Sequence, residues 1–207
     1  MVALLAQALM LGMQACGLSH CLKHFPGHGW VQADSHLALP RDARGQRQIL
    51  RADAAPYGWL RHVARAVMPA HVVYSRVDAL PAGFSERWLR QLLREQLGFA
   101  GAIISDDLSM QGAREIAATG AQAVRMALQA GCDLALVCNL AQLDAGAALD
   151  AILDGLRQAQ HDDAWRPDAA AGARRAALLA SEPPLVWDDL MRDPGYIGAL
   201  DDLARLA

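Results

Sequence analysis

The sequence lacks several features that would point to particular classes of protein. Aromatic residues make up only 5% of it, and its formal net charge of −3 shows no excess of basic residues. This composition gives no indication of binding to nucleic acids or of attraction to an anionic membrane. The four cysteines form neither a CxxC pair nor a zinc-ligand pattern with the histidines. We interpret them as free thiols, which predicts a protein of the reducing cytoplasm.

We expect no targeting or membrane segment in the first residues of the sequence. Residues 1–13 are apolar, yet they have no basic flank and are interrupted by Gln7. The run is too short to span a bilayer. Val2, Leu5 and Leu9 recur at helical spacing, and Gly17 follows as a C-cap. We therefore expect an amphipathic helix here rather than a signal peptide.

Lysine is nearly absent from the sequence. Lys23 is the only lysine, and the other residues of the Lys and Arg total are arginines. It opens the stretch KHFPGHG, residues 23–29, which is soon followed by Asp34-Ser35-His36. A loop rich in glycine and proline contributes little to stability but holds polar groups well at a binding or catalytic site. A single lysine in an arginine-rich chain indicates a need for a compact ammonium group. This motif is the first candidate site.

The rest of the chain alternates between predicted strands and helices. With 207 residues and 54% hydrophobic residues it is long enough and apolar enough for one domain with its own core. Apolar runs, caps and glycines predict strands at residues 19–25, 66–74, 102–105 and 134–138, and helices at 53–64, 86–97, 117–130, 145–160 and 169–180. Such repeats, with nearly continuous apolar strands, predict an α/β fold with a parallel sheet covered by helices.

Each predicted strand ends in polar residues. These are the loop that begins at Lys23, then His71, the pair Asp106-Asp107, and Asn139. The carboxyl ends of parallel strands meet at one edge of a sheet, and sites in α/β proteins are built there. We therefore expect these side chains to lie together. For His71 two interpretations remain open, a core histidine and a residue that lines the site. We include it among the substrate-binding candidates.

The types of residue suggest acid/base chemistry combined with covalent catalysis. Asp34 and His36 are two residues apart, so the carboxylate can orient the imidazole and favour its protonated form. Of Asp106 and Asp107, one is suited to act as a nucleophile while the other caps the next turn or accepts backbone N–H groups. A metal site is the rival interpretation, but proline and glycine exclude the helix that would pair the histidines, so we expect no metal.

Four motifs, in the same order, resemble one known family. They are KHFPGHG with its DSH, MPAHVVY at residues 68–74, LGFAGAIISDDLSMQGA at 97–113 and AGCDLALVCN at 130–139. The chain resembles the β-N-acetylglucosaminidases of glycoside hydrolase family 3, in particular the cytosolic bacterial enzymes of peptidoglycan recycling. The resemblance is continuous from residue 1 to about residue 139.

The resemblance implies roles for individual residues. Asp106 would be the nucleophile that forms a glycosyl-enzyme with net retention, and His36 the general acid/base oriented by Asp34. This differs from the usual pair of carboxylates in retaining glycosidases. Lys23 and His24 would bind sugar hydroxyls. The implied substrates are muropeptides in which GlcNAc is linked to anhydro-muramic acid, with no metal or organic cofactor.

The resemblance also implies that part of the fold is missing. Members of the family are complete (β/α)₈ barrels, whereas this chain supplies about four β/α units. We therefore expect the C-terminal half of a TIM barrel over residues 1–180, without its N-terminal half, followed by a tail at 181–207 with a short helix. Two free sheet edges would remain. Three hypotheses follow: a truncated or split glycosidase, a half-barrel that pairs with itself or with a separate N-terminal half, and a non-catalytic sugar-binding remnant.

Overall fold

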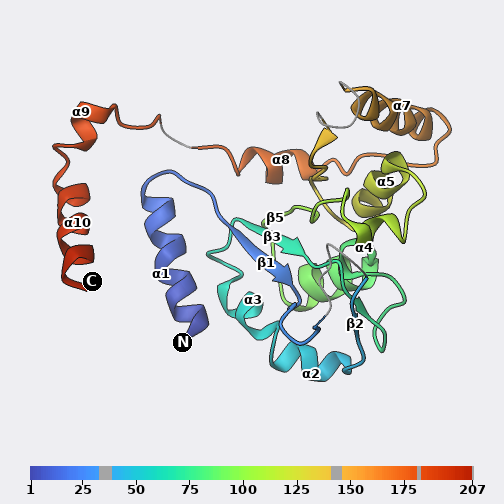
Figure 1. Ribbon diagram of the computed structural model, residues 1–207, viewed down its shortest axis with the longest axis horizontal. Coiled ribbons are helices and arrows are strands. Elements are labelled where there is room, and N and C mark those ends of the chain that lie inside the picture. Colours follow the sequence, from blue (N-terminus) through green and yellow to red (C-terminus); the bar gives the residue numbers. More distant parts are fainter. Residues whose placement is uncertain (33–38, 141–145, 181–182, 207) are drawn as a thin grey trace.

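The protein has the expected α/β organisation, with two small parallel sheets and helices around them (Figure 1). Its structure is a computed structural model that describes residues 1–32, 39–140, 146–180 and 183–206. The larger sheet has the order β1-β3-β5, formed by Cys21–Phe25, Ala66–Pro69 and Ala102–Ile103. The smaller sheet pairs β2, Arg41–Asp42, with β4, Val73–Tyr74. All of these pairings are parallel, so the strands of each sheet end at the same edge.

Two of the predicted strands differ from the structure. The run 66–74 is divided into β3 and β4, which belong to different sheets. The division occurs because the chain turns after Pro69: the N–H of Ala70 donates to Phe25 of β1, whereas the N–H of Val73 donates to Pro40 beside β2. A continuous strand would have kept one partner throughout.

The predicted strand 134–138 is reduced to a single parallel bridge between Ile104 and Leu134. Beyond that bridge, the backbone of this segment is bound partly by side chains. The N–H of Leu136 donates to Ser105 Oγ and the N–H of Cys138 to Asp107 Oδ1, both at 2.9 Å. The segment still lies beside β5, but side chains replace part of the ladder that would make it a strand.

The helices follow the sequence pattern in most places. Thr119 accepts a hydrogen bond from the N–H of Gln122 and so caps α5, Gly120–Ala130, which is followed by Gly131 with a φ of 124°. Regular helices not expected from the pattern are α2, Gln46–Arg51, α4, Gln111–Arg114, and α9, Trp187–Leu190. The full set is α1 Val2–Ala15, α2 Gln46–Arg51, α3 Ala55–Leu60, the 3₁₀ turn Ala82–Phe84, the π-type helix Arg87–Gln96, α4 Gln111–Arg114, α5 Gly120–Ala130, α7 Ala147–His161, α8 Ala171–Ala176, α9 Trp187–Leu190 and α10 Pro194–Leu206.

The first helix forms as predicted, but the expected apolar face is wrong. Val2, Leu5 and Leu9 are 75%, 62% and 67% exposed, whereas Met10 is 3% exposed and buried in the core. Small alanines beside Met10 let α1 approach α3, so the longer apolar side chains point outward. The helix ends with two hydrogen bonds, from Gly17 N–H to Gln14 O and from Leu18 N–H to Met13 O. These form a Schellman motif around the left-handed Gly17.

An aromatic cluster joins the two sheets. The ring of Phe25, at the end of β1, lies 5.1 Å from that of Tyr57 and 5.9 Å from that of Trp88, and Tyr74 of β4 lies 5.0 Å from Trp88. The edge-on geometry of these pairs is a favourable one for aromatic rings. The Tyr74 hydroxyl also donates to the Gly27 carbonyl at 2.8 Å. The core thereby fixes the loop that follows Lys23.

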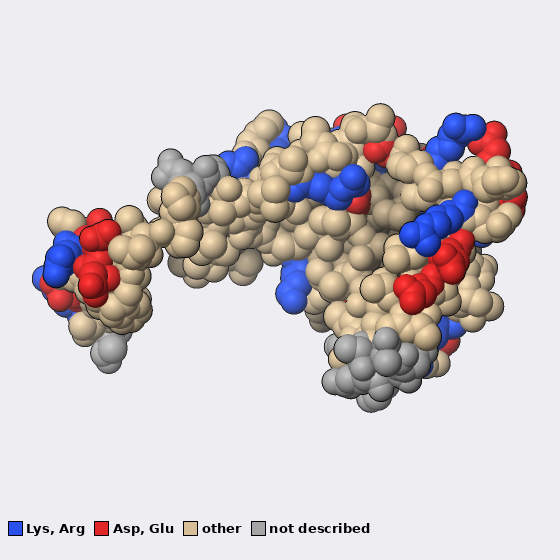
Figure 2. All heavy atoms as spheres, turned by 90° about the horizontal axis from the view of Figure 1, so that it is seen from above, with Lys and Arg blue, Asp and Glu red and all other residues tan. Residues whose placement is uncertain are grey.

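The C-terminal helices stand apart from the rest of the molecule. In Figure 1, α9 and α10 lie beyond α1, and Figure 2 shows charged side chains gathered on the lobe that they form. The short helix expected near the C-terminus is part of α10. In the described part of the chain, no helix has both the length and the apolar character needed to cross a membrane.

At the opposite end of β5 from the candidate site, a buried aspartate ties α8 to the sheet. The carboxylate of Asp133 is 1% exposed and lies 2.7 Å from Arg94 and 2.6 Å from Arg174. It also accepts the backbone N–H of Ile103 in β5 at 2.8 Å. Replacing it would leave two half-buried guanidinium groups without their common partner.

We expect Asp133→Ala to lower the free energy of unfolding by about 3–5 kcal/mol, because removing one member of a buried ion-pair cluster leaves uncompensated charge. Urea unfolding followed by circular dichroism measures this. Asp154→Ala, which breaks an exposed pair with Arg157, is the matched control and should cost at most about 0.5 kcal/mol. Equal losses in the two variants would contradict the role of Asp133.

Candidate active site

The candidate residues on the described strands meet at the carboxyl edge of the larger sheet. Lys23 and His24 lie in β1, and Asp106 follows β5. His71 lies in the turn after β3. Asp34 and His36 lie outside the described residues. The structure therefore brings together one part of the predicted constellation, and the roles of all these residues remain predictions.

A histidine and a carboxylate face each other at this edge. Nε2 of His24 lies 3.7 Å from Oδ2 of Asp106, with the side chains 31% and 13% exposed. Burial lowers the pKa of His24, and Lys23, His28 and His71 lower it further, while the negative charge of Asp106 opposes them. The ring of His28 lies 6.1 Å from that of His24, edge-on. The lowered pKa favours the neutral imidazole of His24, which can donate one hydrogen bond and accept another.

The two adjacent carboxylates have different surroundings. Oδ1 of Asp106 accepts the N–H of Asp107 at 2.8 Å, while its Oδ2 is the atom that faces His24. Asp107 accepts three hydrogen bonds, from the N–H of Ser109 at 2.9 Å, its hydroxyl at 2.7 Å and the N–H of Cys138 at 2.9 Å. Burial alone would raise the pKa of Asp107, but these donors together lower it. Of the two aspartates, Asp106 is therefore the one that directs a carboxylate oxygen at another candidate residue, His24.

His71 lies beneath the site rather than on its surface. Its side chain is fully buried and stacks on Phe84, with ring centroids 5.7 Å apart. Nε2 is 3.1 Å from the carbonyl oxygen of Asp107. Because a carbonyl only accepts, this contact requires the proton on Nε2. The contact shown is thus to the turn that follows β5, and direct contact of His71 with a sugar stays a prediction.

Lys23 and His24 line a cavity of about 340 Å³ between β1, α1 and α3. Leu22, Tyr57 and Leu60 supply its apolar walls, and His28 and Asp53 add polar groups. The Lys23 side chain is exposed. The cavity thus combines one ammonium group and two imidazoles with apolar walls, a composition found in pockets for small molecules.

A buried ion network, not anticipated from the sequence, supports the loop after β1. Arg44 donates to Oδ2 of Asp42 at 2.7 Å, also contacts Asp53, and stacks on Trp30 at 4.5 Å. Hydrogen bonds to Asp42 and Asp53 raise the pKa of Arg44 further above its ordinary value. Gly27 lies against this network with a φ of 151°, and a Cβ there would be 2.4 Å from Cβ of Asp53. Only glycine fits so close to Asp53.

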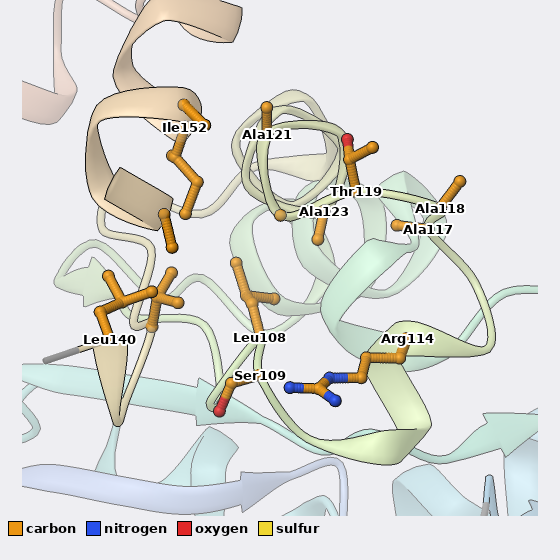
Figure 3. A pocket seen from close by; sticks show the side chains of 14 residues that line it. Leu108, Ser109, Arg114, Ala117, Ala118, Thr119, Ala121, Ala123, Leu140 and Ile152 are labelled. Atoms are coloured by element: carbon orange, nitrogen blue, oxygen red, sulfur yellow. The ribbon is translucent and has the colours of Figure 1, made fainter. Parts of the chain in front are cut away.

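A second hollow of about 550 Å³ lies beside the loop that follows Asp106 (Figure 3). Leu108, Ser109 and Arg114 form one side, and Ile152 of α7 faces them across it. Most of the remaining lining residues belong to α5 and the turn before it. Among the described residues, no group of three or more His, Cys, Asp or Glu side chains is placed to hold a metal ion.

Parallel strands with a carboxylate–histidine pair at their carboxyl edge place the protein among α/β domains with a strand-end site. The comparison with known families is more specific. The profile described as the Glycosyl hydrolase family 3 N terminal domain matches residues 1–166. The chain therefore belongs to glycosyl hydrolase family 3, and the resemblance carried by its four motifs is confirmed.

Individual relatives agree with this assignment. A beta-hexosaminidase of Bordetella avium is 45% identical over 196 residues, covering 94% of this chain and 52% of the relative. A beta-hexosaminidase of Pseudomonas aeruginosa is 53% identical over 137 residues, covering 66% of this chain and 41% of the relative. The crystal structure of NagZ from Neisseria gonorrhoeae in complex with N-trifluoroacetyl-D-glucosamine has a TM-score of 0.78 at 39% identity, covering 100% of this chain and 56% of that one. The chain thus spans about half the length of relatives that it matches.

We expect Asp106→Asn to lower the pKa of His24, because the substitution removes the one charge that raises it and leaves burial and the neighbouring cations to act alone. An NMR titration of the imidazole resonances measures the shift. Asp154→Asn, on the exposed face of α7, is the control and should leave the His24 titration unchanged. A His24 pKa that rises or stays constant in Asp106→Asn would contradict the pairing.

Proposed function

We propose that the chain carries the nucleophile and part of the sugar site of a retaining β-N-acetylglucosaminidase. The proposal depends on one observation: the carboxylate of Asp106 follows β5 and directs one oxygen at His24. The chain in which this pair occurs belongs to family 3. The names of the relatives support a hexosaminidase. The Neisseria structure with a trifluoroacetylated glucosamine supports an N-acylated glucosamine as the sugar.

In the proposed reaction, an oxygen of Asp106 attacks the anomeric carbon while the bond to the leaving oxygen breaks. His36, oriented by Asp34, donates its proton to that oxygen. The product of this step is a glycosyl-enzyme ester on Asp106. His36 then accepts a proton from water, the water oxygen attacks the anomeric carbon, and the ester bond breaks. Two inversions give net retention.

Lys23 and His24 are proposed to hold the sugar. The ammonium of Lys23 donates to hydroxyl oxygens, and the neutral imidazole of His24 both donates and accepts, which matches the two-way hydrogen bonding of a hydroxyl group. We propose a muropeptide with GlcNAc linked to anhydro-muramic acid as the substrate, and the cytoplasm as the place of reaction. All four cysteines are free, which suits a reducing compartment.

We further propose that the sheet is half of a barrel that is completed by additional β/α units. In the described residues, β1 pairs only with β3, so its other edge is free. Beside it, Leu5 and Leu9 of α1 are largely exposed. A free parallel edge and an exposed apolar helix face are the surfaces that adjoining β/α units would cover. Either a preceding portion of the same protein or a second copy would supply them.

The activity is tested by release of 4-nitrophenol from its β-N-acetylglucosaminide. We expect release, and we expect Asp106→Ala to reduce it at least about 10³-fold because the covalent step is lost. The corresponding glucoside, which lacks the acetamido group, is the substrate control. Binding of GlcNAc without turnover, in the chain alone and in the completed barrel, would favour the sugar-binding alternative.

The half-barrel is tested by the mass of the purified chain in size-exclusion chromatography with light scattering. We expect assemblies larger than one copy, reduced towards the monomer by Leu5→Glu with Leu9→Glu, since charge on α1 opposes burial of its outer face. Gln7→Glu adds charge on the same helix at a polar position and is the matched control.

The source of the completing half is decided by a second arm of this experiment. A monomer that gains activity when the amino-terminal portion of the Bordetella relative is added indicates completion by a preceding portion. A monomer that is fully active on its own would contradict the half-barrel.

A further inference from the structure

The carboxylate of Asp107 accepts three hydrogen bonds, although it lies directly beside the candidate nucleophile. Its Oδ1 accepts two backbone N–H groups, from Ser109 and Cys138, and its Oδ2 accepts the Ser109 hydroxyl. Three donors at 2.7–2.9 Å stabilise the negative charge and so lower the nucleophilicity of the carboxylate. A carboxylate held in this way is a poor nucleophile.

The same residue connects three parts of the fold. The side chain joins the turn at Ser109 to the segment at Cys138, while the backbone carbonyl accepts Nε2–H of the buried His71 at 3.1 Å and the N–H of Met110 at 3.1 Å. His71 is itself held by stacking on Phe84. Both peptide groups of Asp107 are thereby fixed, one through its carbonyl and the other through the N–H that it donates to Asp106.

The N–H of Asp107 is the group that orients the neighbouring carboxylate. It donates to Oδ1 of Asp106 at 2.8 Å, which fixes the plane of that carboxylate and leaves Oδ2 on the side of His24. If the Asp107 carboxylate lost its donors, the turn 106–109 would be free to rotate, and the N–H that aims Asp106 would rotate with it.

We propose that Asp107 is a positioning residue, whose carboxylate anchors the turn after β5 so that its own N–H holds Asp106 in the orientation for attack. The proposal rests on the proposed function, in which Asp106 is the nucleophile. His71 supports the same arrangement, because its Nε2–H donates to the carbonyl oxygen of Asp107 and fixes that peptide group. In this proposal Asp106 reacts with the sugar, and Asp107 holds Asp106 in position.

The kinetic test compares Asp107→Asn and Asp107→Ala with the wild type on 4-nitrophenyl β-N-acetylglucosaminide. We expect Asp107→Ala to lower kcat about 10²-fold with KM changed little, since a misplaced nucleophile affects the transition state more than sugar binding. Asp107→Asn keeps one carbonyl oxygen as an acceptor and should lose less.

Asp78 offers a matched control for loss of stability. Its carboxylate also accepts a backbone N–H two residues on, from Leu80, and a serine hydroxyl, from Ser85, but neither of these hydrogen bonds involves a site residue. Asp78→Ala should destabilise the fold to a similar extent without changing kcat. Equal kcat in Asp107→Ala and the wild type, or equal losses in Asp107→Ala and Asp78→Ala, would overturn the proposal.

A second measurement needs no turnover and separates this proposal from the proposed function. In Asp107→Ala the Asp106 carboxylate is no longer aimed at His24, so the NMR-measured pKa of His24 should fall in the same direction as in Asp106→Asn. A His24 pKa equal to that of the wild type would overturn the positioning role. An inactive wild type in which Asp107→Ala still lowers this pKa would overturn the proposed activity and leave the positioning of Asp106 supported.

Discussion

The arrangement of the site depends on the hydrogen bonds that Ser105 and Asp107 make with the segment 134–138. Ser105 Oγ and Asp107 Oδ1 each accept a backbone N–H from that segment at 2.9 Å. These side chains replace part of a regular ladder, so the chain after β5 turns outward while remaining attached to its neighbour. Asp106 is carried on this turn and is thereby presented at the edge of the sheet. The irregularity in the fold and the position of the Asp106 carboxylate at the edge of the sheet have the same cause.

On the other side of the site, the aromatic cluster holds the loop that follows β1 in place. Phe25 ends β1 and packs on Tyr57 and Trp88, and Tyr74 hydrogen-bonds to the backbone of Gly27. The loop that begins at Lys23 is therefore anchored in the core at its first turn. Arg44 and its two aspartates support it from outside. A rigid base at β1 and a rigid turn at β5 bring His24 to within 3.7 Å of Asp106.

The sequence was sufficient to predict the α/β class and the edge at which the described candidate residues lie, because these follow from apolar strands that end in polar motifs. It was sufficient for the family because four of its motifs resemble that family. The sequence was insufficient to predict features of the fold that depend on contacts between distant residues. The split at Pro69 depends on which neighbour accepts each N–H, and the buried side of α1 depends on a close approach to α3 through alanines. The network of Asp42, Arg44 and Asp53 joins residues from a region with no periodic pattern, and only the spacing of Asp42 and Arg44 hinted at a pair.

The central claim is that Asp106, and not Asp107, forms the bond to the sugar. It is tested most directly by trapping the intermediate with a fluorinated N-acetylglucosaminyl fluoride, which slows the second step, and locating the label by mass spectrometry of the digested protein. Cleavage between the two aspartates by fragmentation distinguishes them. The account predicts a label on Asp106, in the wild type and in Asp107→Asn alike. A label on Asp107, or turnover with retention in Asp106→Ala, would contradict it.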